Sequence, residues 1–154
     1  IMLLFTNNSD GILKNFFLYK QSANVPFRIA IWDCDHSYGR DGDNESNMME
    51  REIDCSRSIL LKRLMENPQT NYMHILKHRW QELQELNILT YENFDAHMIR
   101  NHQTIRQCIN ANFNIWPVDA EFYYDDNTYE EELQKMRQFV KLRIEYLHNY
   151  FNVL

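Results

Sequence analysis

Two aspartates, Asp33 and Asp35, follow directly on an apolar segment at residues 27–32. If the extended conformation continues past Trp32, both carboxylates point to the same face, about 6–7 Å apart. Two ionised carboxylates brought to about 4 Å repel by about 4 kcal/mol at an effective dielectric constant of about 20. The pair therefore favours a divalent cation such as Mg²⁺ between its members. The simpler interpretation, that both aspartates cap a turn after the strand, stays open.

Two other kinds of metal site use aspartates at this spacing. In a calcium loop of the EF-hand type that starts at Asp33, the sixth position requires glycine but holds Tyr38, and the twelfth requires glutamate but holds Asn44. The calcium loop is excluded on both counts. A metal-dependent glycosyl or nucleotidyl transferase also places Asp-x-Asp after an apolar strand. It needs a large α/β sheet, and it stays open because we expect native sequence upstream of Ile1.

A second pair of polar residues, Asp10 and Asn15, stands five positions apart immediately before a strand expected at residues 16–19. In protein kinases, a catalytic-loop aspartate accepts the proton of the substrate hydroxyl, and an asparagine five residues later binds a metal ion. A hairpin then delivers a metal-binding aspartate, the position that Asp33 takes here. The order of these residues favours phosphoryl transfer over the transferase alternative, which leaves Asp10 and Asn15 without a role.

The composition bounds the kind of protein that holds these residues. In 154 residues there are 3 glycines and 3 prolines, too few for a β-sandwich or barrel, whereas a hydrophobic content of 44% supplies a core. The formal charge of -6 gives none of the basic excess of a nucleic-acid binder. No apolar run reaches the ~20 residues of a transmembrane helix. The three cysteines are expected to be ordinary thiols, because they form no pattern of metal or disulfide spacing.

The elements that must position these residues divide the chain into two parts. Residues 1–56 hold a turn at 6–11, strands at 16–19 and 27–32, and a solvated loop at 36–56. Residues 57–154 show helical periodicity, with helices expected around 59–66, 72–83, 94–113 and 129–151. Thr90 is placed to cap the third helix, and Thr128 with Glu131 forms a capping box for the last. The predicted architecture is α+β, mainly α: three or four helices packed against a β-hairpin.

The two motifs together resemble the core of the spore coat protein H (CotH) kinase family. The resemblance rests on Asp10-x4-Asn15 followed by FLY at 17–19, and on WDCDHSYG at 32–39, its most specific string. In the helical part it extends to LKRL at 61–64 with NP at 67–68, RWQEL at 79–83 and MRQFVKLR at 136–143. The resemblance covers essentially the whole chain, but only the C-terminal half of a family member.

The resemblance implies a role for each residue of the two motifs. Asp10 would be the catalytic proton acceptor, Asn15 and Asp33 the ligands of Mg²⁺ that bind the ATP cofactor, and Asp35 a second carboxylate ligand. Members of the family are atypical protein kinases that use ATP to phosphorylate serines of spore coat or other surface proteins. The resemblance thus implies a kinase-like C-lobe in a bacterial surface, secreted or spore coat protein.

One departure from a complete kinase is expected to matter. The chain has no glycine-rich loop, and no Lys–Glu pair for the ATP phosphates can be placed in it. We therefore expect an N-terminal lobe upstream of Ile1, absent from this chain, and a partial domain at 1–154 that is inactive alone. The runner-up from a different class is a non-catalytic surface or adhesion module that has kept the fold.

Other polar and aromatic residues receive structural interpretations. His36 is expected to stabilise a turn by hydrogen bonding, rather than to contact a phosphate. His74 and His78 share a helix face but lack an evident third metal ligand. Ion pairs with acidic loops are expected for three arginines: Arg63, Arg79 and Arg143. Core positions are expected for two tryptophans: Trp80 and Trp116. A solvated face, or a binding surface for a basic substrate, is expected for the acidic string of the long loop: Asp41, Asp43, Glu45 and Glu50.

Overall fold

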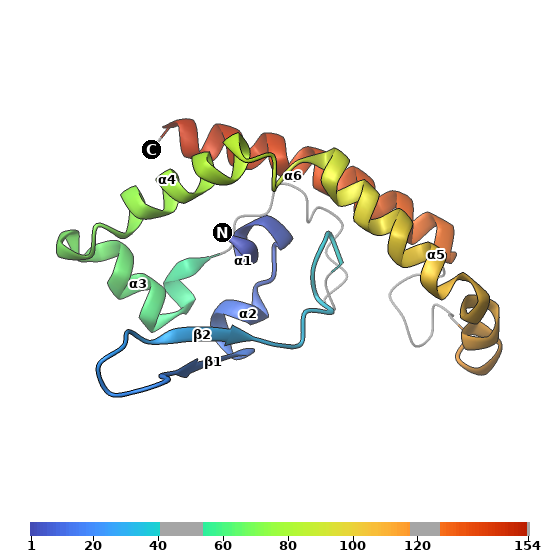
Figure 1. Cartoon of the computed structure of the whole chain (residues 1–154), viewed down its shortest axis with the longest axis horizontal. Coiled ribbons are helices and arrows are strands. Elements are labelled where there is room, and N and C mark those ends of the chain that lie inside the picture. Colours follow the sequence, from blue (N-terminus) through green and yellow to red (C-terminus); the bar gives the residue numbers. More distant parts are fainter. Residues whose placement is uncertain (41–53, 118–126, 154) are drawn as a thin grey trace.

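The computed structural model describes residues 1–40, 54–117 and 127–153. In these residues the chain is mainly helical, with one small antiparallel sheet (Figure 1). The expected α+β, mainly α, fold class is therefore confirmed, while its likeness to a kinase C-lobe stays a prediction. The acidic string of the long loop lies outside the described residues, as does most of the loop itself.

The first part of the chain holds two short helices and the hairpin. Helix α1 spans Met2–Thr6, helix α2 spans Asp10–Leu13, and the strands β1 (Phe16–Tyr19) and β2 (Arg28–Ile31) pair antiparallel, with Phe16 opposite Ile31. The strand at 16–19 is as expected, and the second is shorter than the expected 27–32. The turn expected at 6–11 is partly wrong, since Asp10 already begins a helical turn. The reason is local: the Oδ1 atom of Asn8 accepts a hydrogen bond from the Gly11 amide at 2.6 Å, which stabilises that turn.

The second part begins with a short 3₁₀ turn η1 at Cys55–Arg57 and the helix α3 at Ile59–Glu66. The Ser58 hydroxyl caps α3 by accepting from the Leu61 amide, and the helix stops before Pro68, as the sequence predicts. A further 3₁₀ turn, η2 at Pro68–Thr70, leads into helix α4 at Tyr72–Glu85. In Figure 1, α3 lies at the left above the hairpin, and α4 runs from there along the upper left toward α6.

Two long helices complete the described chain. Helix α5 spans Tyr91–Ile115 and helix α6 spans Tyr129–Val153, and they lie side by side in Figure 1. Both predicted caps are confirmed. Thr90 accepts from the Asn93 amide, and Thr128 accepts from the Glu131 amide while the Glu131 carboxylate accepts from the Thr128 amide. An ion pair of 2.7 Å between Arg137 and Asp95 joins the two helices.

The buried core gathers residues from α1, α4 and α6. Its members are all below a tenth exposed: Phe5, Trp80, Phe139, Val140, Leu147 and Phe151. The core position predicted for Trp80 is confirmed, and that predicted for Trp116 is wrong, since this side chain is 67% exposed. Trp116 follows the last turn of α5, at the end of the helix remote from the core, where none of the described elements packs over it.

Arg143 links the last helix to the first. Its side chain is 1% exposed, its Nε atom donates to the Leu4 carbonyl oxygen at 2.9 Å, and its guanidinium lies over the Tyr146 ring. Arg79 instead forms a 2.6 Å ion pair with Glu82 on its own helix, and not with a loop. None of the three cysteines forms a disulfide bond, as expected. Within the described part of the chain, no helix has the length and apolarity needed to span a bilayer.

Candidate active site

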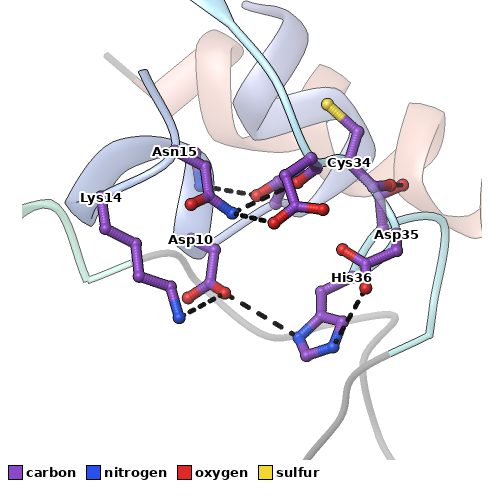
Figure 2. Close-up of polar contacts among 10 residues, drawn as sticks. Asp10, Lys14, Asn15, Cys34, Asp35 and His36 are labelled. Atoms are coloured by element: carbon purple, nitrogen blue, oxygen red, sulfur yellow. Dashed lines mark hydrogen bonds and ion pairs between the residues drawn. The ribbon is translucent and has the colours of Figure 1, made fainter. Parts of the chain in front are cut away.

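Asp10 is the first residue of α2, and its carboxylate is mostly buried. The Oδ2 atom of Asp10 lies 3.0 Å from Nζ of Lys14, one helical turn later (Figure 2). The side chain of Asp10 is 22% exposed, whereas that of Lys14 is 67% exposed. The ion pair was not predicted. The signal for it is the i, i+4 spacing of the two residues, which has this meaning only when residues 10–13 are helical.

Asn15 connects the loop of Asp10 to the end of the hairpin. Its side chain is 5% exposed, and its Nδ2 atom donates to both the carbonyl oxygen and the Oδ2 atom of Asp33, at 3.3 Å each. The backbone of Asn15 is also fixed, because its amide donates to the Asp10 carbonyl oxygen and its own carbonyl oxygen accepts from the Trp32 amide. The structure thus brings together Asp10, Asn15 and Asp33, as the motif order predicts.

Asp33 does not continue the strand. Strand β2 ends at Ile31, and Asp33 adopts a left-handed backbone conformation with φ 57°. The condition under which Asp33 and Asp35 share one face is therefore not met, and the spacing argument for that pair is wrong. A turn follows, in which the Ser37 hydroxyl donates to the Cys34 carbonyl oxygen at 2.5 Å and the Ser37 amide donates to the Asp35 carbonyl oxygen. The left-handed residue directs the Asp33 carboxylate back toward Asn15.

Asp35 and His36 lie on the side of the Asp10 carboxylate away from Lys14 in Figure 2. Nε2 of His36 lies 3.6 Å from Oδ2 of Asp35, and Nδ1 lies 4.0 Å from Oδ2 of Asp10. Figure 2 shows this succession of contacts from Lys14 through Asp10 and His36 to Asp35. Beyond the turn-stabilising role expected for it, His36 lies between two of the predicted site carboxylates.

The charges of the site act on one another. The pKa of Lys14 is raised, first by its hydrogen bond with Asp10, then by the negative charge of Asp10, and also by the charges of Asp33 and Asp35. All three carboxylates therefore stand close enough to Lys14 for their charges to be felt there. This convergence of like charges is favourable to a bound cation.

The oxygen atoms present fit Mg²⁺ at Asn15 and Asp33. These two side chains are in contact through the Asn15 Nδ2 donor and the Asp33 carboxylate. The amide oxygen of Asn15 and the carboxylate of Asp33 are hard ligands of the kind this ion binds. Asp35, whose side chain is 69% exposed and faces His36, is not joined to that pair by any described contact. The described residues hold no cluster of three or more His, Cys, Asp or Glu side chains suited to a metal. His74 and His78 therefore belong to no such cluster. A site made of Asn15 and Asp33 corresponds to the usual Mg²⁺ arrangement, in which one or two carboxylates bind the ion together with substrate phosphates.

Comparison with known proteins agrees with the motifs. The sequence model of the CotH kinase protein family matches residues 1–147. Inner spore coat protein H of Bacillus subtilis (strain 168) is 22% identical over 154 residues, which is 99% of this chain and 39% of that protein. The chain thus spans about two fifths of the length of this relative. No solved structure matches the chain significantly. Because the family model covers nearly all of the sequence, the chain belongs to the CotH kinase family.

Proposed function

We propose that this chain carries the catalytic loop and the metal-binding aspartate of an atypical protein kinase, which transfers the γ-phosphate of ATP to a serine hydroxyl. The observation that supports it best is the contact between Asn15 and Asp33, 18 residues apart, with the Asn15 amide also bonded to the Asp10 carbonyl oxygen. Family membership supports the same reaction. A glycosyl or nucleotidyl transferase that used the Asp33 and Asp35 carboxylates alone would have no use for this connection.

Each residue has a separate task in the proposed reaction. Asp10 accepts the proton of the serine hydroxyl as the oxygen attacks. Asn15 and Asp33 hold the Mg²⁺ ion, which when bound neutralises charge on the phosphate oxygens. Hydrogen bonds fix Asn15 to the backbone of Asp10 and Trp32. They hold the proton acceptor and the metal ligands at a fixed distance from one another. Asp35 is proposed as an additional ligand.

The substrate and location are inferred from the relative. Because that protein is described as an inner spore coat protein, we propose serine-containing coat or surface proteins as acceptors, with a spore coat location. The glycine-rich loop and the Lys–Glu pair of the phosphates are proposed to belong to sequence outside this chain. The chain by itself is then expected to transfer no phosphate.

The test is Mg²⁺-dependent ATP binding by calorimetry, on the full-length protein and its Asp33→Ala variant. We expect binding that requires both the metal ion and Asp33. Asp54→Ala is the control, because Asp54 is an exposed aspartate that caps η1 at the other end of the long loop. A folded full-length protein that binds no ATP would overturn the proposal and favour a non-catalytic surface module.

A further inference from the structure

The ammonium group of Lys14 lies at the edge of the candidate metal site. Lys14 is the C-cap residue of α2, directly before Asn15 in the sequence, and its Nζ atom lies 3.0 Å from Oδ2 of Asp10. Figure 2 shows its side chain extending to the carboxylate of Asp10. Because two thirds of the side chain is exposed, its place is set by the charge it meets and not by packing.

The charges of three carboxylates act on that ammonium group. Asp10 contacts it directly, and the charges of Asp33 and Asp35 act on it as well. A lysine ammonium group is a compact charge with three donors, so the bond to Asp10 leaves donors for a second anionic group. In the metal-free protein this ammonium group offsets part of the repulsion among the carboxylates. It also opposes the approach of another cation.

We propose that Lys14 is the counter-ion of the magnesium site: it weakens the binding of free Mg²⁺ and strengthens the binding of Mg²⁺ that arrives on ATP. This inference rests on the proposed function, since it takes Asn15 and Asp33 as the metal ligands. The physical reason is the sign of the charge that each ligand brings to the ammonium group. A bare divalent cation is repelled by the ammonium group, whereas the phosphates of Mg·ATP carry net negative charge and are attracted to it. The site thereby discriminates in favour of the metal–nucleotide complex.

The two expected effects of removing the charge have opposite signs. Lys14→Met should tighten the binding of free Mg²⁺ by about three- to tenfold, and it should weaken the binding of Mg·ATP by a similar factor. Both changes should shrink as the salt concentration rises, because these charges are exposed to solvent. A general loss of structure would weaken both ligands together and would show no such dependence.

The experiment is a pair of calorimetric titrations on the full-length protein, one with MgCl₂ alone and one with Mg·ATP, each at low and high salt. Lys14→Arg keeps the charge and should bind both ligands as the wild type does. Lys62→Met is the matched control, because Lys62 also forms an exposed i, i+4 ion pair, with Glu66 on α3, and should change neither affinity. Asp33→Ala should abolish metal binding in both titrations.

The outcomes separate this inference from the proposed function. If Lys14→Met leaves both affinities within twofold of the wild type while Asp33→Ala abolishes binding, the counter-ion role is wrong and the proposed metal site stands. The counter-ion role is equally wrong if Lys14→Met weakens the binding of both ligands alike, or leaves the affinity for free Mg²⁺ unchanged. If Asp33→Ala also leaves the metal affinity unchanged, the proposed metal site fails, and the role of Lys14 fails with it.

Discussion

The side-chain amide of Asn15 donates to two oxygens of Asp33, one from the backbone and one from the carboxylate, both at 3.3 Å. The Asn15 carbonyl oxygen accepts from the neighbouring Trp32 amide, so hydrogen bonding between the two segments continues past the end of the sheet. The left-handed backbone of Asp33 turns its carboxylate toward the amide. Two predicted metal ligands are thus held by each other before any metal binds.

This contact separates the roles of Asp33 and Asp35. Asp33→Ala should weaken Mg²⁺-dependent ATP binding by more than about 100-fold, since loss of a direct ligand should cost at least as much as loss of its supporting contacts. Asp35→Ala should cost less than about tenfold, because Asp35 is exposed and faces His36. Calorimetry on the two variants provides the comparison. Equal losses would mean that the carboxylates share the metal, as the sequence spacing alone predicts.

Asp10→Asn tests the proton acceptor. The amide is nearly isosteric with the carboxylate but cannot take up the hydroxyl proton, so turnover should fall by about 10²–10⁴-fold. Because Asp10 is not proposed as a metal ligand, the affinity for Mg·ATP should change by less than about fivefold. Steady-state kinetics with a serine-containing coat protein, together with calorimetry, separates the two quantities. A large loss of affinity would identify Asp10 as a ligand instead.

Arg143 should contribute to stability far more than Arg79. Arg143→Met removes a buried charged donor from the Leu4 carbonyl oxygen and should lower the free energy of unfolding by about 2–4 kcal/mol. Arg79→Met removes an exposed ion pair within α4 and should cost about 0.5 kcal/mol or less. Urea unfolding of the full-length variants measures both. Similar costs for the two would show that the contact between α6 and α1 is not a determinant of stability.

Gly39→Ala should destabilise the turn that follows the site. Gly39 has φ 86°, which is unfavourable for any residue with a Cβ, and an added Cβ would lie 3.0 Å from Cδ2 of the fully buried Phe139. The expected loss is about 1–3 kcal/mol of unfolding free energy, because strain and overpacking act together. Thermal unfolding monitored by circular dichroism checks it. An unchanged melting temperature would mean that the turn adapts without disturbing Phe139.

Much of the fold could be predicted because its signals are local. The caps at Thr90 and Thr128 depend on residues within three positions, and strand β1 depends on a run of four apolar and aromatic residues. The order of Asp10, Asn15 and Asp33 along the chain is equally a property of the sequence. These features required no knowledge of what packs against them.

Other features depended on contacts between distant segments. Nothing near Asp33 requires a left-handed backbone, and its partner is a side chain 18 residues earlier. The burial of Arg143 follows from a carbonyl oxygen 139 positions away, and the exposure of Trp116 follows from the length by which α5 extends beyond the core. The pairing of Lys14 with Asp10 appeared once residues 10–13 proved helical.

The sequence by itself therefore determined which residues are available for chemistry, their order, and the helices and strands that carry them. The tertiary structure decided which carboxylate faces Asn15, which faces His36, and where the charge of Lys14 lies. The physical reason is the distance along the chain over which each interaction acts. Periodicity and capping act over a few residues, whereas the orientation of a side chain in a site is fixed by groups that come close only when the chain has folded.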